Sequence, residues 1–122
     1  MTPRDLVYVG HMLDMARKAM SKTQGISRET YDADENLRFA LIHLIHTVGE
    51  AARQVSREFC NNHPDIRWSD IIGMRHKVVH DYLGIDDDLV WQMATKDLPK
   101  LVTSGTSRVA RHVSAHIVPF YR

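Results

Sequence analysis

The sequence has a single cysteine, Cys60, which excludes a disulfide within one chain. A lone cysteine is typical of proteins that stay in a reducing cytoplasm. The sequence also lacks the apolar run of about 18 residues that a membrane helix needs, and its first residues lack the apolar core of a secretory signal peptide. We therefore expect a soluble, cytoplasmic protein.

An excess of charge of one sign is missing too. The chain has 16 Lys and Arg residues against 15 Asp and Glu residues, which gives a formal net charge of +1. This balance provides no general attraction to nucleic acid, so any affinity for RNA must come from local patches. The length of 122 residues fits one domain with a modest core, for which dimerisation would bury further apolar surface.

Strand patterns, internal repeats and low-complexity segments are absent, and apolar residues recur at helical spacing along most of the chain. Thr2 followed by Pro3 predicts the start of a first helix, which Gly25 should end. The clearest helix is expected over residues 34–60, where apolar residues alternate at steps of four and three. These patterns predict an all-α fold, an up-and-down bundle of four or five helices.

The second half of the chain is expected to contain two further bundle helices. Ser69 can cap one that runs through Arg75 towards Tyr82. The acidic residues 86–88 can open another, and Pro99 should kink or stop it because proline has no N–H to donate.

The last residues differ in composition from the rest. Ser, Thr and Gly over residues 103–107 predict a linker, which can precede a short final helix. We therefore expect a helical domain over residues 1–101 and a C-terminal extension over residues 102–122.

One stretch, residues 75–82, combines groups that suit phosphodiester chemistry. It reads Arg-His-Lys-Val-Val-His-Asp-Tyr. Arg75 keeps its charge at any working pH and can grip a phosphate through two parallel hydrogen bonds, whereas His80 can give or take a proton near neutrality. Such a pair can cleave a phosphodiester without a metal ion.

The spacing of Arg75, His80 and Tyr82 resembles the signature of the HEPN superfamily, and the flanking sequence narrows the resemblance to the HepT branch of toxins. The matching residues keep the family's order and cover roughly residues 3–101: residues 4–5, 11–13, 25–28, 49–52, 71–74 and 98–99, together with Trp68 and Trp91. One departure lies inside the motif, because His76 stands where the family more often has Asn or Asp.

The resemblance implies a homodimeric, all-helical ribonuclease. On that basis His80 is the general base or acid for the ribose 2′-hydroxyl, and Arg75 stabilises charge on the phosphate. His76 can donate a further hydrogen bond to the phosphate. The resemblance also implies a partner, a minimal nucleotidyltransferase antitoxin, that attaches AMP to Tyr82. Alternatively, Tyr82 packs against the dimer partner or stacks on a base.

The geometry of the motif leaves three possibilities open. On an ideal helix Arg75 and His80 point about 140 degrees apart, so they cannot face one phosphate directly. The helix can loosen near His80, the long Arg75 side chain can curl round, or two chains can contribute their motifs to one cleft. The resemblance implies the last arrangement.

Glu50, at the edge of the apolar seam of the long helix, has two possible roles. Its carboxylate can support Arg75 or His80 through a charge-assisted hydrogen bond, or it can pair with Arg53 on the surface.

Eight histidines raise the question of a metal site. His76 with His80, and His112 with His116, have the four-residue spacing that lets two imidazoles share one ion on a helix. Neither pair has an obvious third ligand nearby, so we expect no native metal and no cofactor.

Two other functional interpretations compete with a ribonuclease. The alternative is a catalytically inactive HEPN helical module that binds nucleotide or a partner protein, with His76 marking a drifted site. A purely structural four-helix scaffold fits the periodicity but leaves Arg75, His80 and Tyr82 unexplained.

Overall fold

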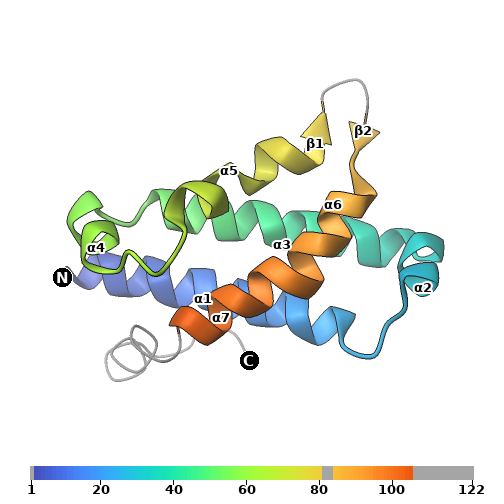
Figure 1. The fold of residues 1–122 in the computed structure, drawn as a ribbon, viewed down its shortest axis with the longest axis horizontal. Coiled ribbons are helices and arrows are strands. Elements are labelled where there is room, and N and C mark those ends of the chain that lie inside the picture. Colours follow the sequence, from blue (N-terminus) through green and yellow to red (C-terminus); the bar gives the residue numbers. More distant parts are fainter. Residues whose placement is uncertain (1, 81–83, 106–122) are drawn as a thin grey trace.

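The computed structural model describes residues 2–80 and 84–105, with the backbone alone at residues 75, 79 and 80, and these residues form a helical bundle (Figure 1). The predicted all-α fold is therefore confirmed. In chain order the elements are α1 (Pro3–Thr23), α2 (Arg28–Ala33), α3 (Glu35–Arg53), α4 (Arg57–Asn62), α5 (Trp68–Val78), β1 (Val79–His80), β2 (Gly84–Ile85), α6 (Asp87–Gln92), the π-helical turn η2 (Met93–Asp97) and α7 (Leu98–Gly105).

The first helix begins as its sequence predicts. The Thr2 hydroxyl accepts a hydrogen bond from the Asp5 N–H at 3.0 Å, and Pro3 occupies the first helical position. At the other end, α1 stops at Thr23, and Gly25 has a φ of 72°, a conformation that glycine adopts without strain.

Asp5 connects the start of α1 to the start of α4. Its carboxylate accepts hydrogen bonds from the N–H and the hydroxyl of Ser56, both at 2.8 Å. Burial tends to raise the pKa of this carboxyl group, but the hydrogen bonds from Ser56 and Thr2 together lower it below its ordinary value.

The helix expected over residues 34–60 is two helices, so that prediction was wrong in its length. The first part, α3, ends at Arg53, and Ser56 then caps α4 by accepting a hydrogen bond from the Phe59 N–H at 3.2 Å. Val55 and Phe59 remain buried despite the break. The apolar spacing survives the bend, which explains why the periodicity alone did not reveal it.

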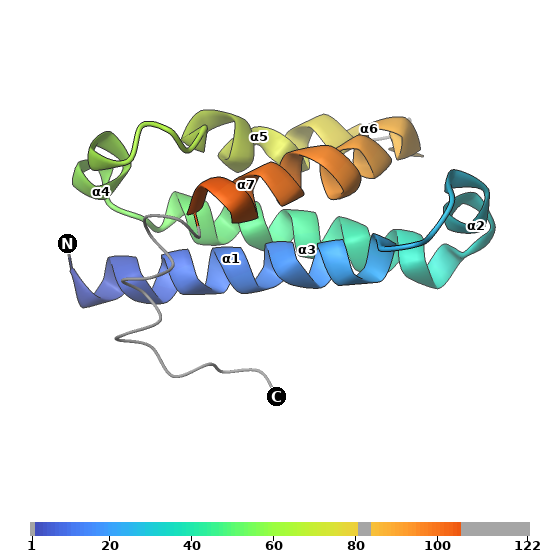
Figure 2. The ribbon, with the colours of Figure 1, turned by 60° about the horizontal axis from the view of Figure 1, so that its bottom comes forward.

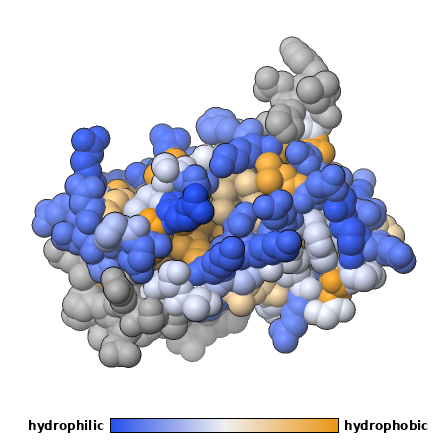
Figure 3. Space-filling model, in the orientation of Figure 1, coloured by the Kyte–Doolittle hydropathy of each residue, from blue (hydrophilic) through white to orange (hydrophobic). Residues whose placement is uncertain are grey.

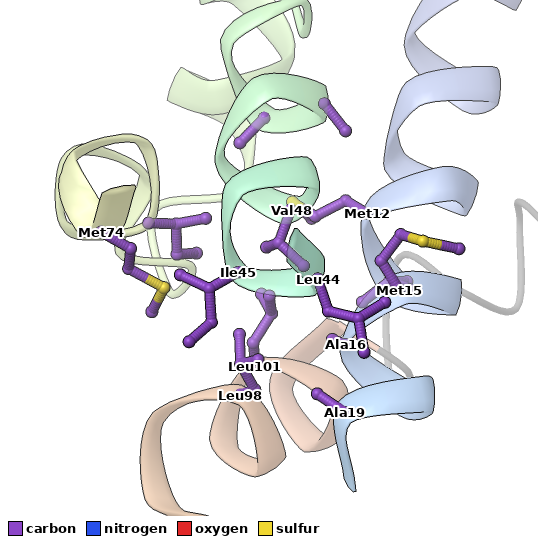
Figure 4. Close-up of a cluster of buried hydrophobic side chains, with 14 of the residues drawn as sticks. Met12, Met15, Ala16, Ala19, Leu44, Ile45, Val48, Met74, Leu98 and Leu101 are labelled. Carbon is purple, nitrogen blue, oxygen red and sulfur yellow. The ribbon is translucent and has the colours of Figure 1, made fainter. Parts of the chain in front are cut away.

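The core lies between α1, α3 and the helices that cover them. In Figure 2, α1 and α3 run side by side along the molecule, and α5, α6 and α7 cover them. Figure 4 shows side chains of these layers meeting in one cluster, with Met12 from α1, Leu44 and Ile45 from α3, Met74 from α5 and Leu98 from α7. All five are at least 95% buried.

Pro99 does not end its helix, so that prediction was wrong. In the π-helical turn η2, the Leu98 N–H reaches back five residues to the Met93 carbonyl. This wider turn shifts the hydrogen-bond register immediately before Pro99, and the helix can then continue despite the missing N–H.

The linker expected over residues 103–107 is also wrong in part, because α7 runs to Gly105 and Val102 packs against the core. The remainder of that linker and the expected final helix lie outside the described residues. Among the described residues, no helix has the length and apolar character needed to cross a bilayer.

Candidate active site

Helix α5, which carries Arg75, packs against α3 at Gly49. A Cβ atom built on Gly49 would lie 3.2 Å from the Ile71 carbonyl oxygen and 3.4 Å from that of Ile72. Both oxygens belong to the backbone of α5, which therefore lies directly on α3 one turn before Arg75. Glycine, which has no Cβ atom, permits this close approach of the two helices.

The helix does not run on towards Tyr82, contrary to the prediction. It ends at Val78 and is followed by a short antiparallel pair, in which Val79 faces Ile85 and His80 faces Gly84. Gly84 has a φ of 84°, so glycine suits the return of the chain. The strands had no signal in the sequence, because two residues are too few to show an alternating pattern.

The end of α5 resolves part of the geometrical question that the motif raised. Arg75 is in the helix and His80 is in the strand β1, so the separation of about 140 degrees on one ideal helix does not apply. Of the three possibilities, a loosening of the helix before His80 is present. A cleft shared by two chains stays a prediction.

The remaining motif residues are placed as follows. His76 is exposed on α5, in the turn after Gly73, and Lys77 beside it is exposed as well. Tyr82 lies outside the described residues. The supporting role expected of His76 therefore stays a prediction, as do the roles of Arg75, His80 and Tyr82.

Glu50 pairs with Arg53, which was one of the two roles expected of it. Its carboxylate lies 3.4 Å from the guanidinium of Arg53, and both side chains are about half exposed. An exposed pair of this kind contributes little to stability. A supporting role for Glu50 towards Arg75 or His80 stays a prediction.

A groove of about 520 Å³ runs beside the motif helix, between α5 and the segment formed by η2 and α7. Apolar side chains line it, and Figure 3 shows apolar surface in a hollow of this face, surrounded by hydrophilic surface. Its apolar lining is Ile66, Ile71, Met74, Met93 and Leu101, and its charged lining is Asp65, Arg67, Asp70, Lys77, Asp97 and Lys100. The groove reaches the motif, because Lys77, which lines it, is one of the motif residues 75–82.

The histidine pairs that raised the question of a metal site are not described in full, because the side chain of His80 is among those not described. Within residues 2–80 and 84–105, apart from the undescribed side chains, no three His, Cys, Asp or Glu residues gather closely enough to hold an ion. His112 and His116 lie outside the described residues.

One part of the surroundings escaped the sequence reasoning altogether. The short helix α2 follows the cap residue Ser27, and its Tyr31 hydroxyl donates to the Asp87 carboxylate at 2.8 Å. Asp87 begins α6, two residues after β2. The Ser27 cap was a local signal for α2, but the contact with Asp87 joins residues 56 positions apart and has no signal in one sequence.

Comparison with known proteins identifies the family. The family described as "Ribonuclease HepT-like" matches residues 12–104. The chain belongs to this family. The resemblance to HepT proteins that the motif predicted is thus confirmed at the level of the family.

Individual HepT-like relatives match over most of their length. A protein of Caldanaerobacter subterraneus subsp. tengcongensis, named "Putative RNase", is 32% identical over 100 residues, which are 82% of this chain and 88% of the relative. The "Probable ribonuclease HepT" of Thermococcus cleftensis is 33% identical over 79 residues, or 65% of this chain and 72% of that one. No solved structure matches the chain significantly.

The contact between α3 and α5 predicts opposite effects for two glycines. Gly73→Ala should raise the free energy of unfolding by about 0.5–1 kcal/mol, because alanine favours a helix and its Cβ would meet nothing within 4 Å. Gly49→Ala gains the same propensity but must push two backbone carbonyls away, so it should lower that free energy by about 1–3 kcal/mol. Urea denaturation of both variants tests this, and equal stabilities would contradict the close contact.

Proposed function

We propose that this HepT-like protein is a ribonuclease that cleaves RNA without a metal ion, with His80 and Arg75 as its catalytic residues. The observation that carries the proposal is family membership together with the Arg75, His80 and Tyr82 motif. The position of the motif is compatible with it, since Arg75 ends up near the end of α5 and His80 follows on β1. A lone cysteine and an RNA substrate fit a cytoplasmic enzyme.

The proposed reaction is an internal transfer at phosphorus. His80 takes the proton of the ribose 2′-hydroxyl, the 2′-oxygen attacks the adjacent phosphorus, and the bond to the 5′-oxygen breaks. The leaving 5′-oxygen receives a proton, and the other product carries a 2′,3′-cyclic phosphate. Arg75, assisted by His76, stabilises the charge that develops on the phosphate oxygens.

Removing either catalytic side chain should abolish most of the activity. His80→Ala and Arg75→Ala should each lower the rate of RNA cleavage roughly 10²-fold or more, with unchanged thermal unfolding. EDTA should leave the wild-type rate unchanged. A rate that vanishes with EDTA and returns with a divalent ion would refute the metal-independent scheme, and an inactive wild type would favour the non-catalytic binding module.

The groove along α5 supports a homodimer. It offers apolar lining from Met74, Met93 and Leu101, with charges of both signs around it, so a second copy related by a two-fold axis can meet it with opposite charges. Because Lys77 lines the groove, such a dimer would bring the motifs of both chains close together.

A substitution at the mouth of the groove tests the dimer. Thr103 is exposed and lines the groove, so Thr103→Arg should convert a dimer into a monomer in light scattering without unfolding the chain. Gln92→Arg, at an exposed position of α6 outside the groove lining, should leave the dimer intact. A monomeric wild type would exclude the homodimer. A dimer that survives Thr103→Arg would show that its interface is not the groove.

We further propose that the ribonuclease is the toxin of a toxin–antitoxin pair, in which a minimal nucleotidyltransferase neutralises it by attaching AMP to Tyr82. Tyr82 lies two residues beyond His80 in the sequence. Each AMP adds negative charge and bulk, so it would repel and displace RNA phosphate from Arg75.

Tyr82→Phe should separate the ribonuclease activity from its neutralisation by the antitoxin. The phenol has no part in the attack by the 2′-hydroxyl, so the variant should retain most of the ribonuclease activity while escaping neutralisation by the partner and ATP. Intact-mass spectrometry after co-expression should show added AMP on the wild type and none on the variant. Neutralisation of unmodified wild type without ATP would mean that the antitoxin acts by binding alone.

A further inference from the structure

The strand pair that contains His80 is short. Within the described residues its ladder consists of two residue pairs, and both Gly84 and Ile85 of β2 are exposed. A two-stranded ribbon is marginally stable alone in water. The position of His80 must therefore depend on how the two ends of this ribbon are anchored in the bundle.

The first end is anchored by burial. Val78, the last residue of α5, is 1% exposed, and its carbonyl accepts a hydrogen bond from the Asp86 N–H at 2.9 Å. This bond closes the base of the ribbon. The second end continues directly from Asp86 into α6, whose N-cap is the Asp86 side chain, which accepts from the Leu89 N–H at 3.1 Å.

The second end is also held by α2, whose side chains contact the start of α6. Tyr31 is fully buried, its ring lies 5.3 Å from that of Trp91, and its hydroxyl donates to the Asp87 carboxylate at 2.8 Å. Burial, and then the bond to Asp87, raise the pKa of the Tyr31 phenol well above its usual range. The hydroxyl therefore remains a donor over the whole working range of pH.

A second contact joins the same two helices on the surface. The Arg28 guanidinium lies 2.8 Å from the Asp88 carboxylate, but the Asp88 side chain is 88% exposed. A solvent-screened pair of this kind holds a helix weakly. The buried hydrogen bond of Tyr31 is the stronger of the two restraints on the first turn of α6.

We propose that Tyr31 is a positioning residue for catalysis: through its hydrogen bond to Asp87 it fixes the start of α6, and through β2, which leads into α6 and pairs with β1, it fixes the backbone of His80. This inference rests on the proposed ribonuclease function. Arg75 belongs to α5, which packs on α3 at Gly49 independently of the contact between Tyr31 and Asp87. Tyr31 therefore affects proton transfer by His80 and not phosphate binding by Arg75.

The kinetic test uses Tyr31→Phe, which keeps the ring against Trp91 and removes only the donor. Losing one net hydrogen bond of about 1 kcal/mol at the anchor should lower kcat roughly 5- to 10-fold, with KM changed less than twofold. In the His80→Ala background the same change should have no further effect, because both substitutions act on one step. Asp87→Asn, whose amide oxygen still accepts the bond, should keep most of the activity.

The control is Tyr8→Phe, which removes the phenol of a half-buried tyrosine in the first half of α1, a helix whose start lies at the opposite end of the bundle from α2 (Figure 1). It should leave kcat and KM unchanged. If Tyr31→Phe instead raises KM and leaves kcat intact, or adds its loss to that of His80→Ala, then Tyr31 does not act through His80 and the proposal fails.

Hydrogen exchange separates this inference from the ribonuclease function itself. Tyr31→Phe should speed amide exchange in β1 and β2 several-fold while exchange in the middle of α1 and α3 stays as in the wild type. This outcome supports the anchor even if the wild type cleaves no RNA, a result that would refute only the catalytic part. Unchanged exchange in both strands would overturn the anchor regardless of activity.

Discussion

The contact between the backbones of α3 and α5 at Gly49 is the constraint on which the candidate site depends. Two carbonyl oxygens of α5 lie 3.2 and 3.4 Å from the point where any other residue would place a Cβ atom. This packing fixes how α5 lies on α3 one turn before Arg75. The core side chains around it, including Ile45 and Met74, then hold the two helices together over their length.

The two proposed catalytic residues receive support from different parts of the fold. Arg75 is part of a helix packed on the core, whereas His80 is on a ribbon whose ends are held by Val78 and by α6. A rigid element suits a residue that grips phosphate, and a lightly held one suits a site that must admit a long flexible substrate. The division also means that substitutions distant from the motif can change one role without the other.

Local signals in the sequence predicted the elements whose ends are set by neighbouring residues. Thr2 with Pro3 identified the start of α1, and Gly25 identified its end. Elements governed by distant contacts were missed: the bend at Ser56 uses the carboxylate of Asp5, 51 positions away. Pro99 was misjudged because the sequence gives no sign of the π-helical turn that accommodates it.

The candidate site shows the same division. The types and spacing of Arg75, His80 and Tyr82 identified the motif and its family, since their chemistry is visible in the sequence itself. The strand that carries His80 was missed because two residues are too few to show an alternating pattern, and the contact of Tyr31 was missed because its partner Asp87 lies 56 positions away. Local chemistry was thus predictable, whereas the way the fold supports it was not.

The chemistry of the cleaved RNA ends tests the central claim most directly. Purified protein should be incubated with a defined single-stranded RNA in EDTA, and the ends of the fragments identified by mass spectrometry. We expect 2′,3′-cyclic phosphates opposite 5′-hydroxyls, as attack by the ribose 2′-hydroxyl requires. Fragments with 3′-hydroxyl and 5′-phosphate ends, formed only when a divalent ion is added, would contradict it.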